Sequence, residues 1–402
     1  MRIAYFVHDL SDPAVSRRVR MLLAGSAEVT VLGFRRSDKA PHIPGAEVVD
    51  LGRTHDGAFV QRIGKVLHAV ARCPALKPAL AGADVVMARN LEMLLLATVA
   101  RRLHRPAAGL VYECLDVHRL MVGRGPVGAA LRGLERGLMR AAGLLVVSSP
   151  AFIDSYFAPR QGEDGRGRLP VLLVENKVLE LTAPAASPAA VRPVGPPWRI
   201  GWYGAIRCRR SLDLLAQLAA RRPDLVGVEI RGRPAYTEFD DFEARVAGVP
   251  GLRFGGPYSA QDLADLYGGV HFAWAIDWFE AGANSAWLLP NRVYEGGRYG
   301  AVPLALNGVE TGRWLAARGL GVLVDDPATR LEAVLEAMTP DRYRALAARA
   351  AAAPAADFVA GPDDCRELVQ RLAATQRDAL SGVDVARPKF DAIGGGMPCP
   401  DA

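Results

Sequence analysis

The sequence has few features of a secreted, membrane-spanning or metal-binding protein. Its five cysteines are odd in number, are scattered, and form no CxxC motif or Cys/His cluster: Cys73, Cys114, Cys208, Cys365 and Cys399. This usage argues against a disulfide framework or a zinc site and favours a reducing compartment. No run of about 18 apolar residues occurs, and residues 1–7 resemble a short strand more than a signal peptide. We therefore expect a cytoplasmic protein with no membrane span and no metal.

The composition predicts a globular protein with more than one domain. The chain has 402 residues, of which 50% are hydrophobic and 23% are charged, and a chain of this length usually forms two or more domains. Residues 1–185 contain 25 Lys and Arg against 17 Asp and Glu, whereas residues 186–402 contain 24 against 26. The basic first half suggests an anionic partner, for which nucleic acid, a membrane surface and a phosphorylated acceptor all qualify. An arginine-rich proteome is the alternative explanation.

Short apolar runs alternate with amphipathic segments along both halves of the chain. Runs with little internal alternation predict parallel strands that are covered on both faces. The expected strands are residues 2–7, 28–33, 47–51, 84–88, 109–113, 143–148 and 171–175, then 198–204, 226–231, 252–255, 270–275, 302–306 and 321–324. This α/β pattern predicts two doubly wound domains, which bind ligands outside the carboxyl ends of their strands.

The expected domain division follows changes in composition. It comprises a first domain at residues 1–182, an Ala- and Pro-rich linker at 183–197, a second domain at 198–355, a terminal helix at 356–380, and a polar tail at 381–402. We expect the tail to fray, because it is rich in glycine, proline and polar residues.

One block in the second half predicts a nucleotide site. A helix of about ten residues is expected with Pro290 in its first turn, and Gly300 can supply a left-handed cap at its end. The first N–H groups of such a helix are unpaired and attract an anion, so Asn291 and Arg292 are placed at a phosphate site. Glu295 lies one turn further in, where a carboxylate can accept hydrogen bonds from a diol. Phosphate and diol together describe a nucleotide; the alternative is a surface Glu on a surface helix.

A cationic turn begins the second half. Residues 202–211 follow the order of strand, glycine, cationic loop and helix start. Gly204 lets backbone approach a ligand closely, and Arg207, Arg209 and Arg210 offer planar donors suited to phosphate. The stretch has neither GxGxxG nor GxxxxGK[ST], so it supports neither a dinucleotide site nor a P-loop. The alternative is a solvated basic loop.

The block around Glu295 resembles the nucleotide-sugar site of retaining glycosyltransferases with the GT-B fold, the large family that includes sucrose synthase and phosphatidylinositol mannosyltransferase. That family has Pro-x-Lys-x-x-Glu, a short helix and Gly-x-Pro-Val, and here Arg292 replaces the Lys. The resemblance spans residues 2–375. It implies two Rossmann-like domains that face each other across a cleft, with a C-terminal helix crossing back to the first. Two phrases resemble exopolysaccharide transferases of the succinoglycan type and are interpreted as scaffold: Ser148-Ser149-Pro150 and Glu175-Asn176-Lys177.

The resemblance also implies roles for single residues. Glu295 would bind the ribose hydroxyls of the donor, an arginine of the cationic turn would neutralise its diphosphate, and backbone groups at Tyr258 would meet the base. Two positions depart from the family: Ala205 replaces an Arg, and Trp287 replaces a second Glu, which leaves Glu280 as the nearest acid upstream. No cofactor or metal is expected, because cations and a helix dipole can stabilise the leaving diphosphate.

The first half supplies candidates for chemistry. Asp116 and His118 follow a strand at its carboxyl end, where they can line a cleft, and the family often has a His near that position. Together with Arg207 and Arg210 they form the predicted catalytic set, although a lone His is often structural. His8 and Asp9, after the first strand, are candidates to meet the acceptor.

The sequence therefore predicts a retaining, metal-independent glycosyltransferase. We expect it to move a hexose from a nucleoside diphosphate sugar, with UDP favoured, to a saccharide or polyprenyl-diphosphate-linked acceptor for a surface polysaccharide. Nucleic acid is not an expected partner. The rival hypotheses are a nucleotide-sugar epimerase or phosphorylase of the same fold, a non-catalytic nucleotide-sugar binding protein, and a two-domain dehydrogenase.

A basic helix in the first half predicts contact with a membrane. Within residues 125–142, Arg132, Arg136 and Arg140 recur at helical spacing beside leucines. A basic amphipathic helix can lie on an anionic bilayer, so we expect peripheral attachment to the inner face of the cell membrane. A plain surface helix is the alternative.

Overall fold

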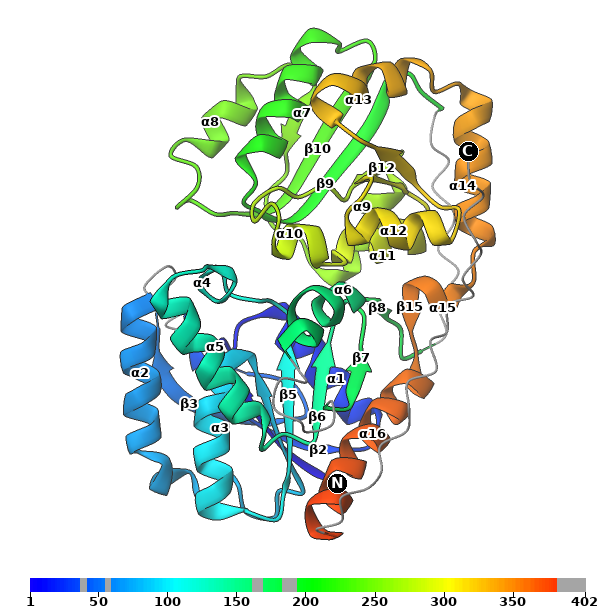
Figure 1. Ribbon diagram of the computed structural model, residues 1–402. Coiled ribbons are helices and arrows are strands. Elements are labelled where there is room, and N and C mark those ends of the chain that lie inside the picture. The colour runs from blue at the N-terminus through cyan, green and yellow to red at the C-terminus, as the bar shows by residue number, and fades with distance from the viewer. Residues whose placement is uncertain (37–41, 55–58, 161–168, 183–193, 382–402) are drawn as a thin grey trace, which may run out of the picture.

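Two all-parallel β-sheets, each flanked by helices, form the two halves of the molecule. In Figure 1, one half lies above the other. The computed structural model describes residues 1–36, 42–54, 59–160, 169–182 and 194–381. Every strand predicted from an apolar run is present, with small shifts at the ends. The interior strands are buried along nearly their whole length, as expected for sheets covered on both faces.

The first sheet has seven strands with its topological switch point between β1 and β4. Across the sheet the order is β3 (Glu47–Arg53), β2 (Glu28–Arg35), β1 (Arg2–Val7), β4 (Val85–Arg89), β5 (Gly109–Cys114), β6 (Leu144–Val147) and β7 (Val171–Leu173). The connecting elements are α1 (Pro13–Ala24), α2 (Phe59–Ala71), η1 (Cys73–Leu76), α3 (Asn90–His104), α4 (Arg119–Val122), α5 (Pro126–Met139), α6 (Pro150–Phe152), η2 (Ile153–Phe157) and η3 (Ala158–Arg160).

The second sheet has six strands and repeats this winding, with its switch point between β9 and β12. The order is β11 (Leu252–Phe254), β10 (Val226–Pro234), β9 (Trp198–Ile206), β12 (Phe272–Trp274), β13 (Val302–Leu306) and β14 (Val322–Val324). Its helices are α7 (Arg209–Arg221), α8 (Phe242–Ala247), η4 (Ala260–Asp262), α9 (Leu263–Gly268), α10 (Asn284–Trp287), α11 (Asn291–Arg298), α12 (Glu310–Ala317), α13 (Pro327–Glu336), α14 (Pro340–Ala352) and α15 (Ala355–Phe358).

Each sheet has a hydrophobic core on both faces. In the first half, α1 packs on one face, and α2, α3 and α5 pack on the other. In the second half, α7, α8 and α13 cover one face, while α11, α12 and α15 cover the opposite one. The carboxyl ends of both sheets are left for the connecting loops, and these loops build the site described below.

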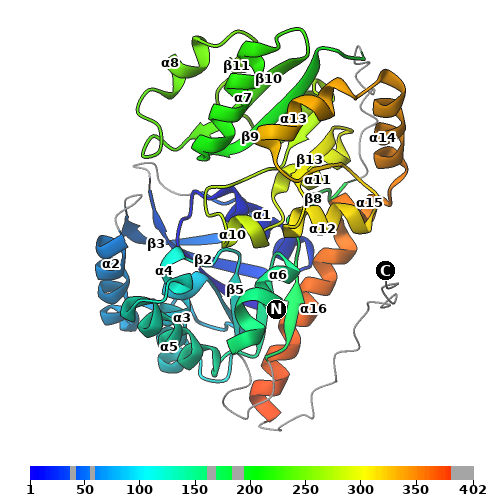
Figure 2. The same cartoon turned by 45° about the horizontal axis from the view of Figure 1, so that its top comes forward.

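The end of the chain returns to the first half. After α15, helix α16 (Pro362–Ser381) packs beside α1 and against β5, and Figure 2 shows it running along the lower half of the molecule. Cys365, Leu368 and Leu372 of α16 belong to the same core as Val15 of α1. A two-stranded parallel sheet, β8 (Val178–Leu179) with β15 (Val359–Ala360), lies where the chain crosses. The terminal helix thus crosses back as the resemblance implied.

Two predicted segments lie partly or almost wholly outside the residues that the structure describes. Of the predicted linker, residues 183–193 lie outside the described residues, and the same is true of residues 382–402 in the predicted tail. Among the helices that the structure describes, none is both long and apolar enough to cross a bilayer.

Candidate active site between the two sheets

A pocket of about 290 Å³ lies between the carboxyl ends of the two sheets. Its second-half wall includes Gly204, Arg207, Tyr258 and the start of α11. Its first-half wall consists of Leu115, Asp116, Ser148, Phe152 and Asn176. The pocket therefore lies where doubly wound domains bind ligands, at the switch point of the second sheet.

Helix α11 directs its amino end toward this pocket. Pro290 is the N-cap residue with extended backbone, φ −72° and ψ 148°, so the helix begins one residue later than the prediction placed it. It is eight residues long, slightly shorter than expected. Gly300 follows it with φ +79°, in the predicted left-handed conformation. Pro290, Asn291 and Arg292 all line the pocket, which places the amino end of the helix and its positive dipole end at the wall.

Glu295 and Arg292 bring opposite charges to the same wall. The hydroxyl of Tyr267 donates a hydrogen bond to Glu295 Oε2 at 2.8 Å. Burial raises the pKa of Glu295, while the Tyr267 hydrogen bond and the positive charge of Arg292 act in the opposite direction. Arg292 Nη1 donates to the carbonyl oxygen of Tyr203 at 3.3 Å, but its Nε is buried without a hydrogen-bond partner in the described structure. A buried donor without a partner is costly unless a ligand satisfies it.

Only one of the three arginines of the cationic turn reaches the pocket. Strand β9 continues to Ile206, so Arg207 directly follows the strand, and its Nη2 lies 3.4 Å from Asp277 Oδ2, beyond β12 on the other side of the switch point. Arg209 and Arg210 are instead the first residues of α7. They line a separate hollow between α7 and α13. The Arg210 guanidinium carbon also lies 4.4 Å from the centroid of the Trp278 ring. The structure does not bring Arg209 and Arg210 to the predicted site, because the helix has already begun.

Gly204 and Tyr258 complete the second-half wall. Gly204 has φ +113°, a conformation that other residues rarely adopt, and it lies beside Gly232 on the neighbouring strand. The Tyr258 ring contacts that of Tyr203, with 6.2 Å between their centroids. Ala205, in the position where the family has an arginine, also lines the pocket.

Asp116 is the predicted catalytic residue that faces the pocket from the first half. Its side chain is solvent-exposed within the cleft, yet both halves surround it. Desolvation by these walls and the negative charge of Glu280 raise the pKa of Asp116 to about 6, against a lowering by Arg207. A carboxylate that titrates near neutral pH is suited to accept a proton from a substrate hydroxyl.

His118 occupies a different place. It is the N-cap of α4, and its Nδ1 accepts a hydrogen bond from Leu120 N at 3.3 Å. Its side chain lines a neighbouring cavity of the first half together with Asp116. Asp116 and His118 thus share the neighbouring cavity, but only Asp116 also lines the pocket between the two sheets.

Asn284 holds Asp116 against the second half. Its Oδ1 accepts a hydrogen bond from Val117 N at 3.0 Å, and its Nδ2 donates to Val117 O at 2.8 Å. The same Nδ2 group also donates to Glu280. The backbone between Asp116 and His118 is therefore fixed by a side chain that is 167 residues away in the sequence.

Trp287 explains the departure from the two-glutamate motif. Its ring lies 6.4 Å from that of Phe152 and 6.5 Å from that of Tyr156, both in the core of the first half. Its carbonyl oxygen accepts a hydrogen bond from Ser149 Oγ. The position where many members have an acid thus serves the contact between the halves.

Glu175 joins the two halves on the other side of the pocket. Its Oε1 accepts hydrogen bonds from the Tyr294 hydroxyl at 3.0 Å and from Trp314 Nε1 at 2.9 Å. Its carbonyl oxygen accepts one from Arg17 Nη2 at 2.9 Å. The positive charge of Arg17, on α1 of the first half, partly offsets the rise that burial causes in the pKa of Glu295. Sequence reasoning assigned residues 175–177 to the scaffold and missed Arg17, since no local pattern reveals partners this far apart.

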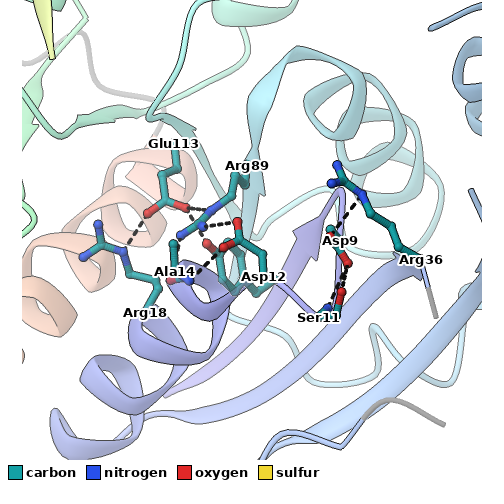
Figure 3. Close-up of polar contacts among 9 residues, drawn as sticks. Asp9, Ser11, Asp12, Ala14, Arg18, Arg36, Arg89 and Glu113 are labelled. Atoms are coloured by element: carbon teal, nitrogen blue, oxygen red, sulfur yellow. Dashed lines mark hydrogen bonds and ion pairs between the residues drawn. The ribbon is translucent and has the colours of Figure 1, made fainter. Parts of the chain in front are cut away.

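A buried ionic cluster lies beneath the first-half wall, as Figure 3 shows. Glu113, at the end of β5, accepts hydrogen bonds from Arg18 Nε at 2.6 Å, from Arg89 Nε at 2.7 Å and from the hydroxyl of Tyr5. Burial raises the pKa of Glu113, but Arg89 and Arg18 outweigh this effect and lower it to about 2. Glu113 is thus ionised at neutral pH and ties α1, β4 and β5 together three positions before Asp116.

The polar groups after β1 are engaged elsewhere. Arg36 Nε lies 3.1 Å from Asp9 Oδ2, and Asp9 Oδ1 accepts a hydrogen bond from Ser11 N at 2.9 Å (Figure 3). Asp9 was a candidate to meet an acceptor, and the structure instead uses its carboxylate to shape the loop. His8 lines the cavity of the first half.

One glycine pattern escaped the sequence reasoning. Gly123, Gly125 and Gly128 match GxGxxG. Gly123 and Gly125 lie between α4 and α5, and Gly128 lies in the first turn of α5. The three glycines follow no strand, so they lack the setting of a dinucleotide fingerprint.

Solved structures that resemble this one show its class of fold. The protein superposes on sucrose-phosphate synthase from Thermosynechococcus elongatus with a TM-score of 0.65 at 14% identity, and the match covers 95% of this chain and 98% of the other. It also superposes on Anabaena HepE in complex with UDP and glucose, with a TM-score of 0.63 at 16% identity, and this match covers 95% of this chain and 100% of the other. The protein has the GT-B fold, as the resemblance in its sequence implied.

A curated relative identifies the family. The chain is 46% identical over 395 residues to the succinoglycan biosynthesis protein ExoL of Rhizobium meliloti (strain 1021), and the match covers 96% of each chain. The protein belongs to the family of that succinoglycan biosynthesis protein. No protein-family model matches the sequence.

Proposed function

We propose that the protein is a glycosyltransferase that moves a hexosyl group from a nucleoside diphosphate sugar to a hydroxyl of an exopolysaccharide precursor. One observation carries this proposal: Glu295, Arg292, Arg207 and Asp116 line the same pocket between two doubly wound sheets. The first three suit a nucleoside diphosphate, and the fourth faces them from the opposite wall.

The donor would be held by three separate contacts. The Glu295 carboxylate accepts hydrogen bonds from the ribose hydroxyls. The diphosphate lies at the amino end of α11, where the helix dipole is positive and Arg292 Nε has no hydrogen-bond partner in the described structure. Arg207, beside the switch point, adds a second cation on the side of Asp116. Tyr258 lies next to the base.

The transfer step then needs only groups of this chain. The bond between the anomeric carbon and the β-phosphate oxygen breaks, and its electron pair stays on the diphosphate, where Arg207 and Arg292 stabilise it. The acceptor hydroxyl oxygen bonds to the anomeric carbon on the same face, and its proton passes to Asp116. We infer a retaining reaction from the family resemblance and metal independence from these cations.

The relatives support the choice of donor and pathway. HepE is a solved neighbour in complex with UDP and glucose, which favours a UDP-hexose here. The curated relative is a succinoglycan biosynthesis protein, which favours an extracellular polysaccharide precursor as the acceptor. We propose a lipid-linked form of this acceptor, since a basic first half suits work beside an anionic membrane.

The first test is donor binding by the wild-type protein and by Glu295→Gln. Thermal shifts are measured with UDP-, GDP- and ADP-glucose; a ligand at 100 times its Kd stabilises a fold by about 2.7 kcal/mol. We expect the UDP-sugar to stabilise the wild type. Its affinity should fall at least tenfold in Glu295→Gln, because a hydrogen bond to a charged group contributes about 1.5–3 kcal/mol.

Controls separate the rival functions. Glu367→Gln, on the exposed face of α16, should bind the donor like the wild type. Equal donor affinity in Glu295→Gln would make Glu295 a structural residue. A new sugar nucleotide formed from donor alone would establish an epimerase instead, and turnover that is lost in chelator and restored by Mg²⁺ would contradict the metal-free step.

A further inference from the structure

Arg17 is a cation of the first half whose charge acts on the pocket wall of the second half. It lies on α1, and its Nη2 donates a hydrogen bond to the carbonyl oxygen of Glu175 at 2.9 Å. The charges of Arg17 and Glu295 attract each other across the boundary between the halves. Arg17 is not among the described residues that line the pocket, so any effect that it has on a bound donor passes through another side chain.

Glu175 holds Arg17 and helix α11 in one arrangement. Its carbonyl oxygen accepts the hydrogen bond from Arg17, while its Oε1 accepts hydrogen bonds from the Tyr294 hydroxyl at 3.0 Å and from Trp314 Nε1 at 2.9 Å. Tyr294 is buried and directly precedes Glu295 on α11. One residue of the first half thus fixes both the cation and the helix that carries the carboxylate.

The ionisation of Glu295 depends on the groups around it. Titratable groups that interact with its carboxylate come from α11 and from neighbouring elements: Arg17, Tyr258, Tyr267, Arg292 and Tyr299. Burial raises the pKa of Glu295, and Arg17 is the first-half cation among the groups that oppose this rise. Burial lowers the pKa of Arg17 to about 10, so Arg17 still carries its charge at neutral pH.

A bound diphosphate would make this cation more important. In the proposed donor complex, the diphosphate lies beside Arg292 and brings negative charge to the same end of α11. Negative charge near a carboxylate favours its protonated form, and Arg292 is then engaged by phosphate oxygens. Arg17, anchored on Glu175, remains to oppose this effect from the other half.

We infer that Arg17 is a positioning residue for donor binding: it holds the Glu295 carboxylate in the ionised form that accepts the ribose hydroxyls. An ionised acceptor makes hydrogen bonds roughly twice as strong as a neutral one. The inference rests on the proposed glycosyltransferase function and makes the first half a part of the donor site. Donor affinity then depends on the contact between α1 and α11.

The test measures binding of UDP and of its dideoxy analogue, which lacks both ribose hydroxyls, by calorimetry. Arg17→Gln removes the charge and retains an N–H donor. It should weaken UDP binding roughly threefold to tenfold and leave binding of the dideoxy analogue unchanged. As the pH falls, the loss of UDP affinity should begin at a higher pH in Arg17→Gln than in the wild type, because a carboxylate without a nearby cation protonates more readily.

Two further variants show whether the charge acts through Glu295. Arg17→Lys keeps the charge and should bind UDP with nearly the affinity and pH dependence of the wild type. Arg17→Gln combined with Glu295→Gln should bind UDP no more weakly than Glu295→Gln alone, because two residues that act on one contact are not additive. Arg20→Gln is the matched control, since Arg20 is exposed on the same helix, and it should behave like the wild type.

Three results would overturn the inference: equal losses for UDP and the dideoxy analogue in Arg17→Gln, a loss in Arg17→Lys as large as in Arg17→Gln, or additive losses in the double variant. In each case, tight UDP binding by the wild type would leave the proposed function intact. A wild-type protein that binds neither nucleotide would reject the proposed function itself, and the inference with it.

Discussion

Asp116 combines two properties that rarely meet in one side chain. It is open to the cleft, and its pKa is nevertheless raised to about 6 because the walls of the cleft desolvate it and Glu280 repels its charge. Below that pH the carboxyl group holds a proton and cannot accept another. Above it, the carboxylate is ready to take the proton of an acceptor hydroxyl.

The titration of Asp116 should therefore appear in the pH dependence of turnover. We expect kcat to rise with pH through about 6, because burial and the charge of Glu280 raise the pKa of Asp116 above its ordinary value. Asp116→Asn should lower kcat strongly and abolish this rise of kcat with pH, while UDP binding persists. The measurement is a pH–rate profile with saturating donor.

Two variants make the assignment specific. His118→Gln should keep the rise of kcat near pH 6, because His118 caps α4 and lines only the neighbouring cavity. Asp154→Asn, an exposed position in η2, should match the wild type. If His118→Gln removed the rise of kcat near pH 6 and Asp116→Asn retained it, the proton acceptor would be the histidine.

At the scale of elements, helix α11 shows how packing and binding depend on each other. Its Gly297 faces Phe358 of α15, and a Cβ added there would overlap the phenyl ring. This close approach holds α11 between β13 and α15. The amino end of the same helix forms the wall at which we place the diphosphate.

A pair of Gly→Ala variants tests this packing. Gly297→Ala should lower the thermal midpoint, because overpacking a buried contact costs about 1–3 kcal/mol. UDP affinity should fall with it as α11 shifts. Gly133→Ala in α5 is the control: an added Cβ meets nothing within 4 Å, so it should stabilise the helix by about 0.5–1 kcal/mol. If Gly297→Ala raised the thermal midpoint instead, α15 would be able to move aside and accommodate the added methyl group.

Helix α5 corrects one element of the sequence interpretation. Arg132 was grouped with Arg136 and Arg140 as a stripe for a membrane. In the structure, Arg132 Nη1 donates to the carbonyl oxygens of Met121 and Gly123 at 2.8 and 2.7 Å, so it closes the turn between α4 and α5. Exposed apolar side chains on this helix are instead Val127 and Leu134.

At the scale of the whole molecule, charge differs between the halves. The basic residues of the first half remain a reason to expect attachment to an anionic membrane, and salt should weaken it. Arg136→Gln with Arg140→Gln, leaving Arg132 in place, should reduce co-sedimentation with vesicles that contain anionic lipid. Each arginine near such a surface contributes about 1 kcal/mol.

The matched control for this experiment is Arg253→Gln with Arg330→Gln, two exposed positions of the second half. It removes the same charge and should leave co-sedimentation unchanged. Equal losses in both double variants would mean that net charge alone governs binding. Sedimentation that is the same with neutral and anionic vesicles would reject the attachment.

The sequence by itself determined the layers of this protein. Strands covered on both faces must be apolar along their length, so runs such as residues 2–7 and 302–306 were recognisable without any partner. The block from Pro290 to Gly300 was equally local, because a helix start, a carboxylate one turn on and a left-handed cap lie within a few residues of one another. β8 and β15 were missed, since each is only two residues long and is defined by its distant partner.

Only the tertiary structure decided which of the predicted residues share a site. Arg207 reaches the pocket and Arg209 does not, because the helix begins between them and turns the later side chains outward. Asp116 acquires its raised pKa from Glu280, and Val117 is held by Asn284, through contacts between residues that are more than 150 positions apart. Local sequence patterns fix the period and length of an element, whereas a desolvated carboxylate or a bridging amide depends on which loops the two sheets bring together.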